Sequence, residues 1–318
     1  MSVGHSDDKT WVVGAGGLLG GALTRALVRR GSIPFRPGRV DWSRVDASRP
    51  ALADALGGFF SLPAGRDRWR IAWCAGAGVT GAAAVSIEDE VATFEHFLGG
   101  LRALAPRSTG TLFVASSAGG VYAGSVGAPF SEADPPIAIS AYGKGKLAVE
   151  SLAARFAHET GHRVIIGRIA NLYGPGQDLG KSQGLISHLC RSMLTRKPIS
   201  IYVSLDTIRD YLFVDDCAEM IADALDAAAP PASALCTKIF ASQRGTTVAE
   251  LIGECGRIFK KRPSLILGTS PNARFQAKDL RLTSAVWPEL DRRQFTPLPA
   301  GIAATASSLL RTFQQTGR

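Results

Sequence analysis

Short apolar runs alternate along the first half of the chain with longer segments in which apolar residues recur every three to four positions. The short runs are rich in β-branched residues and predict strands, and the longer segments predict amphipathic helices. Strand, helix and strand in this rhythm indicate an α/β fold with a parallel sheet covered on both faces. The predicted strands are Thr10–Val13, Arg70–Cys74, Thr111–Ala115 and Arg163–Arg168. The predicted helices are Leu19–Arg30, Glu88–Leu104 and Lys144–Glu159.

Length and composition describe an ordinary globular chain. Its 318 residues, 46% hydrophobic and 20% charged, suit one large α/β unit or two closely joined ones. The longest apolar runs fall well short of the roughly 20 residues that a membrane span requires. The first nine residues are polar and unlike a targeting peptide. We expect a cytoplasmic protein that does not bind a membrane.

The spacing of cysteines, histidines and basic residues restricts the partners. The five cysteines include no C-x-x-C pair and the five histidines show no ligand spacing, which favours reduced thiols and no metal site. The net charge of +9 comes mainly from the two ends of the chain, without a dense Lys/Arg run. We therefore expect a small polyanionic ligand, such as a dinucleotide or a nucleotide diphosphate, and no nucleic acid.

The first predicted strand runs into three glycines at three-residue intervals and then into a predicted helix. The first glycine permits a tight turn, the second lets the backbone approach a pyrophosphate, and the third lets the helix pack closely on the strand. The helix N-terminus then points its N–H groups at the anion. We therefore predict a Rossmann-type doubly wound sheet and dinucleotide binding, in preference to a purely structural turn. The predicted cofactor-binding residues are Gly14, Gly17, Leu18, Leu19 and Gly20.

The alternation of predicted strands and helices becomes less regular after about residue 172, where Pro and Gly become frequent. We predict that residues 10–172 form the Rossmann domain, with later segments contributing to its sheet. Residues 173–318 would form a smaller, mainly substrate-binding part that is interleaved with the first.

The segment after the first predicted helix indicates which dinucleotide is bound. NAD-binding sheets carry an acidic residue at the end of the second strand, where it binds the adenosine ribose. By spacing Gly38 occupies that place here, with Arg36 and Arg39 beside it. Arginines without a carboxylate suit the 2′-phosphate of NADP, so we predict NADP(H) in preference to NAD(H). The alternative is two solvated loop arginines, with Asp41 binding the ribose.

A tyrosine and a lysine four residues apart form the candidate catalytic pair. Tyr142 and Lys146 stand at the start of the third predicted helix, and the spacing places both on one helical face. A nearby cation favours the phenolate, so we predict that Lys146 lowers the pKa of Tyr142 toward working pH. The alternative is a half-buried tyrosine beside a surface lysine. The position of the pair favours catalysis, because it follows Ser116 and Ser117 at the end of a predicted strand.

These motifs make the chain resemble the extended short-chain dehydrogenases/reductases, a family of NAD(P)-dependent nucleotide-sugar epimerases, dehydratases and reductases. The matching motifs appear in family order over about residues 10 to 216. They are the glycine turn, Ser116–Tyr122, Tyr142-x-x-x-Lys146, Arg168–Gly176 and Arg209–Asp216, with Arg274–Asp279 as a fainter match.

The resemblance implies roles for the catalytic candidates. Tyr142 would be the acid/base on the sugar oxygen, and Lys146 would bind the nicotinamide ribose and depress the pKa of the tyrosine. Ser117 would hydrogen-bond the reacting oxygen, with Ser116 in reserve. The family's hydroxyl usually lies one position later, where this chain has Ala118. The family's 4,6-dehydratases place Asp-Glu just after that hydroxyl, and this chain has no carboxylate there, so we do not expect dehydration.

The resemblance also implies residues that bind substrate and cofactor. Asn171 and Arg209 would hold the substrate's diphosphate, and Arg274 is a weaker candidate for the same role. Alternatively Asn171 is a turn residue and Arg209 pairs with its neighbour Asp210. The sequence of the second predicted strand differs from the family's usual motif, but the small residues around Cys74 and Ala75 still permit close approach of the cofactor. Cys74 itself is expected to be a buried core thiol.

The function predicted from these motifs is NADPH-dependent reduction of a keto group, at C4, of a nucleotide-activated hexose. The alternatives are a nucleotide-sugar 4-epimerase with a retained cofactor, a reductase of a non-sugar carbonyl, and a non-catalytic NADP(H)-sensing regulator. Relatives pair two helices per subunit into a four-helix bundle. The resemblance therefore implies a homodimer through Glu88–Leu104 and Lys144–Glu159.

Overall fold

A parallel sheet lies at the centre of the structure, a computed structural model that describes residues 8–42, 44–62, 68–76, 84–105, 110–180, 183–227, 234–269 and 276–316. In spatial order the strands are β1 (Lys9–Val13), β2 (Trp69–Trp73), β3 (Gly110–Ser117), β4 (Arg163–Ile169) and β8 (Leu235–Phe240). The register aligns Val13 with Trp73, and Ser117 with Ile169. The carboxyl ends of the strands therefore meet at one edge, and the predicted α/β fold with a parallel sheet is confirmed.

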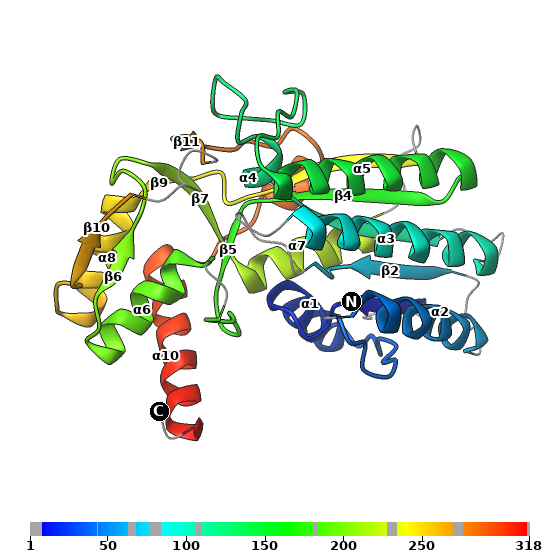
Figure 1. Ribbon diagram of the computed structural model, residues 1–318, viewed down its shortest axis with the longest axis horizontal. Helices are drawn as coiled ribbons and strands as arrows, with labels where there is room; N and C mark the ends of the chain where they lie inside the picture. The colour runs from blue at the N-terminus through cyan, green and yellow to red at the C-terminus, as the bar shows by residue number, and fades with distance from the viewer. Residues whose placement is uncertain are drawn as a thin grey trace.

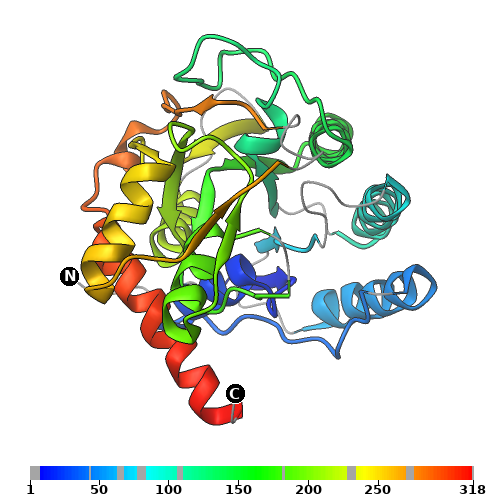
Figure 2. The same cartoon turned by 60° about the vertical axis from the view of Figure 1, so that its left-hand side comes forward.

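Helices cover both faces of this sheet (Figure 1). Successive side chains of a strand point to opposite faces, so Val12 packs with the helices of one layer and Trp11 and Val13 pack with those of the other. Figure 2 shows the second layer lined up along one side of the molecule. The first layer contains α1 (Leu18–Arg29) and α7 (Val214–Asp226), and the second contains α2 (Val45–Ser61), α3 (Ala84–Leu104) and α5 (Ala141–Thr160).

A smaller part of the structure lies beyond the carboxyl edge of the sheet, at the left of Figure 1. Its core joins Tyr173 and Leu189 to Leu251 and Ile302. Its helices are α6 (Leu185–Thr195), α8 (Val248–Phe259) and α10 (Leu298–Thr316), and the short helix α9 (Pro288–Asp291) packs near α7. Its strands are β5 (Asn171–Tyr173), β6 (Ile199–Ile201), β7 (Ile208–Phe213), β9 (Gly245–Thr247), β10 (Leu265–Leu267) and β11 (Asp279–Leu280). Because α7 and β8 return to the main sheet, the two parts are interleaved.

Two features near the amino end differ from a simple alternating pattern. Helix α2 was not predicted, because Pro50 and two adjacent glycines within it disfavour helix. The burial of Leu52, Leu56 and Phe59 in the core overrides that preference. The second Rossmann strand is reduced to one parallel bridge between Phe35 and Trp11 at the edge of the sheet.

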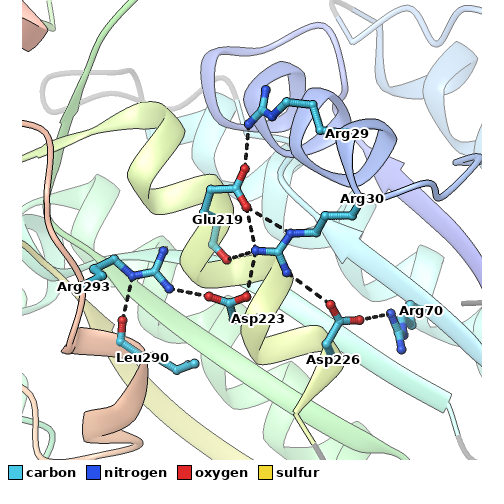
Figure 3. Close-up of polar contacts among 8 residues, drawn as sticks. All are labelled: Arg29, Arg30, Arg70, Glu219, Asp223, Asp226, Leu290 and Arg293. Carbon is cyan, nitrogen blue, oxygen red and sulfur yellow. Dashed lines mark hydrogen bonds and ion pairs between the residues drawn. The ribbon is translucent and has the colours of Figure 1, made fainter. Parts of the chain in front are cut away.

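Ion pairs tie α1 to α7 on the outside of the first helix layer (Figure 3). Arg30 contacts Glu219 at 2.6 Å, Asp223 at 2.7 Å and Asp226 at 3.2 Å. The same carboxylates also bind neighbouring arginines from α1, β2 and the segment before α10. We call this set the α1–α7 charge network, and its members are Arg29, Arg30, Arg70, Glu219, Asp223, Asp226 and Arg293.

Candidate active site

The glycine turn joins β1 to α1 at the carboxyl edge of the sheet. Gly14 has a φ of +86°, and a Cβ there would lie 2.7 Å from the backbone N of Ala75. A Cβ on Gly20 would lie 2.2 Å from the Gly14 carbonyl oxygen, so only glycine lets α1 pack this closely on the strand. By contrast, a Cβ on Gly16 would meet nothing within 4 Å. Open space therefore lies beside the amino end of α1, where Gly17 is the N-cap, and a pyrophosphate fits there.

Leu18 and Leu19 begin α1 directly after this turn. Leu19 is buried in the core, whereas Leu18 only packs against it. Cys74 and Ala75 follow β2 and face the turn, since the Cys74 N–H donates to the Val13 carbonyl at 2.9 Å. Burial raises the pKa of the Cys74 thiol to about 12, which agrees with an unreactive thiol.

Arg36 and Arg39 lie just beyond the edge of the sheet. The Phe35 N–H donates to the Thr10 carbonyl at 2.7 Å. Arg36 is therefore the first residue after the backbone separates from β1. The side chains of Arg36 and Arg39 are exposed, and neither forms an ion pair with a residue that the structure describes. Both remain available for an anion at the end of the second strand.

Tyr142 and Lys146 lie in the first two turns of α5, one turn apart. Ser140 caps this helix by accepting a hydrogen bond from the Gly143 N–H at 3.0 Å. Lys146 Nζ lies 5.6 Å from the centroid of the Tyr142 ring and 2.7 Å from Glu90 Oε1 of α3. Burial alone would lower the pKa of Lys146, but the electrostatic influence of Tyr142 and the charge and hydrogen bond of the Glu90 carboxylate outweigh it and raise this pKa.

Ser117 ends β3 and caps the short helix α4 (Ala118–Val121), where its hydroxyl accepts a hydrogen bond from the Gly120 N–H at 3.2 Å. A Cβ on Gly120 would lie 3.0 Å from the Tyr142 ring, and a Cβ on Gly143 would lie 2.2 Å from the Gly120 carbonyl. Helix α4 thus packs directly on the first turn of α5. Gly120 therefore lies next to both the Ser117 hydroxyl and the Tyr142 ring.

Ser116 lies outside this group. Its side chain is buried, and its hydroxyl donates to Glu150 Oε1 at 2.5 Å. Glu150 of α5 also forms a buried ion pair with Arg168 of β4 at 2.8 Å, and Arg168 donates to the Tyr122 hydroxyl at 2.7 Å. This cluster joins β3, β4 and α5, and so fixes the middle of α5 relative to the sheet. Sequence reasoning assigned no such role to Glu150, although its spacing of four from Lys146 was visible.

The predicted diphosphate ligands lie next to the same edge. A Cβ on Gly119 would lie 3.6 Å from Asn171 Oδ1, which places Asn171 beside α4. Arg209 of β7 is 7% exposed. Its guanidinium donates to the Ile208 carbonyl at 2.8 Å and contacts other neutral acceptors, and it forms no ion pair with a described residue. Arg274, the weaker candidate, lies outside the described residues.

The alternative partner of Arg209 does not bind it. Asp210 instead accepts hydrogen bonds from Ser242 and from the Arg244 N–H, and burial raises its pKa to about 6. The described residues contain no group of three or more His, Cys, Asp or Glu side chains that could hold a metal ion. Within the same residues, the helices are too short or too polar to cross a membrane.

A glycine turn and a Tyr–Lys pair at the carboxyl edge of a parallel sheet define a dinucleotide-dependent α/β enzyme. The sequence profile of the "NAD dependent epimerase/dehydratase family" matches residues 72–234. The chain therefore belongs to this family, whose members are nucleotide-sugar epimerases, dehydratases and reductases, and the predicted enzyme class is confirmed.

Individual relatives resemble parts of the chain or its fold. The dTDP-4-dehydro-6-deoxyglucose reductase of Escherichia coli is 34% identical over 108 residues, which are 34% of each chain. The dTDP-L-rhamnose 4-epimerase of Burkholderia thailandensis is 35% identical over 87 residues, 27% of this chain and 24% of the relative. The chain thus matches about a third of the first relative's length and about a quarter of the second's. The structure of Thermus thermophilus UDP-glucose 4-epimerase with NAD shares the fold, with a TM-score of 0.77, 20% identity and coverage of 95% and 99%.

Proposed function

We propose that the protein is an NADPH-dependent reductase of a keto group, at C4, of a nucleotide-activated hexose. The observation that carries this proposal is that Tyr142 and Lys146 lie together at the start of α5, with α4 packed against the tyrosine ring and Gly76 beside the lysine. The similarity to the E. coli reductase supports the direction of the reaction and the substrate class.

The cofactor would lie along the carboxyl edge, between the glycine turn and Lys146. The turn at Gly14, Gly17 and Gly20 would bind its pyrophosphate at the open amino end of α1, and Leu18, Leu19, Cys74 and Ala75 would border it. When bound, NADPH supplies the hydride. Lys146 would bind the nicotinamide ribose through an ammonium group that also lies beside the tyrosine ring.

Tyr142 would supply the proton. As the carbonyl carbon gains the hydride, the carbonyl oxygen takes the phenol proton of Tyr142 and becomes a hydroxyl, and the phenolate then regains a proton from water. Lys146 stabilises that transient phenolate by its positive charge. Ser117 would hydrogen-bond the reacting oxygen and hold it in line with the phenol.

Arg209 and Asn171 would hold the diphosphate of the substrate. A buried guanidinium without a carboxylate partner is costly for the folded protein, and two phosphates would satisfy it by charge-assisted hydrogen bonds. Arg274 would assist from the segment beyond β10. A reductase of a non-sugar carbonyl would not need this pairing.

The preference for NADP(H) is part of the proposal. Arg36 and Arg39 are exposed and without ion pairs to described residues, beside the point where the adenosine ribose of a Rossmann cofactor lies. Exchanging both for alanine is expected to raise the KM for NADPH about tenfold or more and to leave that for NADH nearly unchanged. Equal effects on both cofactors would contradict the preference.

We also propose a homodimer in the cytoplasm. Helices α3 and α5 pack side by side in the outer layer (Figure 2) and could pair with their copies in a four-helix bundle. The five cysteines are free, which suits a reducing compartment. Leu152 is a partly buried residue on α5, and sedimentation analysis of the wild type and of Leu152→Glu tests the dimer. A variant with the same mass as the wild type would contradict this interface.

The state of the purified protein distinguishes the reductase from its alternatives. A reductase is expected to be isolated empty, to bind NADPH and to oxidise it when a nucleotide 4-keto sugar is added. A tightly retained oxidised cofactor, with interconversion of 4-epimers and no net NADPH consumption, would identify the epimerase instead. Binding of NADPH without turnover of any carbonyl substrate would indicate a sensor.

A further inference from the structure

A carboxylate lies against the lysine of the catalytic pair. Glu90 Oε1 is 2.7 Å from Lys146 Nζ, although the two residues are 56 positions apart in the sequence and lie on different helices. The side chains are only 15% and 10% exposed. The reduction described above uses Tyr142, Lys146 and Ser117 and assigns no task to this carboxylate.

The surroundings keep this pair together. A Cβ on Gly76, in the segment after β2, would lie 2.8 Å from Glu90 Oε1 and 3.1 Å from Lys146 Nζ. The backbone at Gly76 therefore lies directly against the charged ends of both side chains. This position packs the end of β2 against both α3 and α5.

Few other charges act on Lys146 within the described residues. On its own helix it faces Tyr142, and from α3 it faces Glu90. The next carboxylate along α5, Glu150, is bound by Arg168 of β4. From the segment after β2 the pair meets the backbone of Gly76. The balance of charge beside the tyrosine ring therefore depends on Glu90.

We propose that Glu90 is a positioning residue of the active site: its carboxylate holds the Lys146 ammonium beside Tyr142 and partly cancels the positive charge that reaches the phenol. An ammonium paired at 2.7 Å acts on the ring 5.6 Å away as a dipole, whose field falls off faster than that of a free charge. The pairing therefore reduces the positive potential that Lys146 exerts on the phenol of Tyr142.

This charge balance suits a proton donor. A group that donates a proton must be protonated at the working pH, whereas a group that abstracts one must be ionised. Glu90 thus biases the pair toward carbonyl reduction and away from alcohol oxidation. The inference rests on the proton-donor role that we propose for Tyr142.

The test is a direct titration of Tyr142 in the protein without substrate. Ultraviolet difference spectra of phenolate formation are recorded against pH, and the spectra of Tyr142→Phe are subtracted to isolate this one tyrosine. Glu90→Gln removes the charge and keeps the shape, and we expect it to lower the pKa of Tyr142 by about one unit. Glu90→Asp keeps the charge, and we expect it to retain most of the wild-type value.

Glu95→Gln is the matched control. Glu95 lies on the same helix and pairs with Arg155 of α5 at 2.9 Å, but both side chains are more than half exposed. Its loss is expected to leave the titration of Tyr142 unchanged. Where Glu90→Gln does not fold, the smaller uncharged Glu90→Asn takes its place.

A folded Glu90→Gln or Glu90→Asn that leaves the pKa of Tyr142 within about 0.2 unit of wild type overturns the inference. So does an equal shift in Glu95→Gln, because the effect would then be a general loss of charge. The titration needs no substrate turnover, so its result is independent of whether the proposed substrate is correct. With an active substrate, the alkaline limb of kcat/KM should move to lower pH in Glu90→Gln by the same amount.

Discussion

Arg30 is a partly exposed arginine and Arg209 a buried one, and their partners differ. Arg30 contacts three carboxylates of α7, at the centre of the α1–α7 charge network (Figure 3). Arg209 is more deeply buried and contacts only neutral oxygen atoms of the described residues. Arg30 is thus paired with carboxylates, whereas Arg209 forms no ion pair with a described residue.

We propose that this difference separates an arginine that stabilises the fold from one that binds a ligand. A charge removed from water costs free energy unless partners compensate it. The α1–α7 charge network supplies those partners and joins two helices with the start of β2. Arg209 instead has no ion pair with a described residue, and the nearby charge of Asp279 only partly offsets the effect of burial, which lowers the pKa of this arginine. We propose that an anionic substrate supplies the missing partner.

Tyr142→Phe, a change in the candidate active site, is expected to have the largest effect. The ring that contacts Gly120 remains, so the Tm should stay within about 1 °C, but the proton donor is lost. We expect kcat to fall by about 10² to 10⁴-fold. Steady-state kinetics with parallel thermal unfolding test this, and a kcat within tenfold of wild type would exclude Tyr142 as the acid.

Arg209→Met should weaken substrate binding without weakening the fold. Loss of the phosphate contacts is expected to cost about 2 kcal/mol or more, about 30-fold in KM for the nucleotide sugar. The free energy of unfolding should be unchanged or higher, because an uncompensated charge leaves the interior. Urea unfolding together with kinetics measures both. A clear loss of stability with unchanged KM would make Arg209 a structural residue.

Arg30→Met should give the opposite pattern. Methionine keeps much of the aliphatic packing, but Glu219, Asp223 and Asp226 are left close together without their shared cation. Because Arg30 is 29% exposed, the loss should lie between surface and buried ion pairs, at about 1–2 kcal/mol of unfolding free energy. The value of kcat/KM should stay within about twofold. Unchanged stability would show that the network contributes nothing.

The smallest effect is the acid dependence of that network. Partial burial alone would raise the pKa of Glu219, but Arg29 and Arg30 outweigh it and lower this pKa below the ordinary 4.5. Its stabilising contribution is therefore complete above pH 4.5 and is lost as the pH falls through the lower value of the folded state. Between about pH 5 and 3 the stabilities of wild type and Arg30→Met should converge. Parallel curves would show that Glu219 does not titrate against Arg30.

Local sequence signals predicted the framework of the fold. The glycine turn was recognisable because Gly14 and Gly20 have no space for a Cβ. This steric requirement acts on individual residues, so their identities reveal it in the sequence. The strand and helix patterns located the parallel sheet and the helices α1, α3 and α5. Helix α2 was missed because its propensity is poor, and only its packing in the core explains it.

Contacts between residues far apart in the chain could not be predicted from the sequence. The motif order indicated Tyr142, Lys146 and Arg209, but no local signal connects Lys146 to Glu90, which is 56 residues earlier. The contacts of Arg30 with Glu219 span 189 residues. Ion pairs of this kind depend on which helices become neighbours, and that is decided by the whole fold. The sequence indicated the reacting groups better than the charges that surround them.

The most direct test of the proposed reaction follows the hydrogen itself. The enzyme is incubated with NADPH that carries deuterium at the transferred position and with a nucleotide 4-keto hexose, and the product is analysed by mass spectrometry and NMR. A reductase incorporates one deuterium, at C4, for each NADPH consumed, and Tyr142→Phe slows this transfer without changing its position. Conversion of the sugar with no deuterium incorporated and no NADPH consumed would contradict the account.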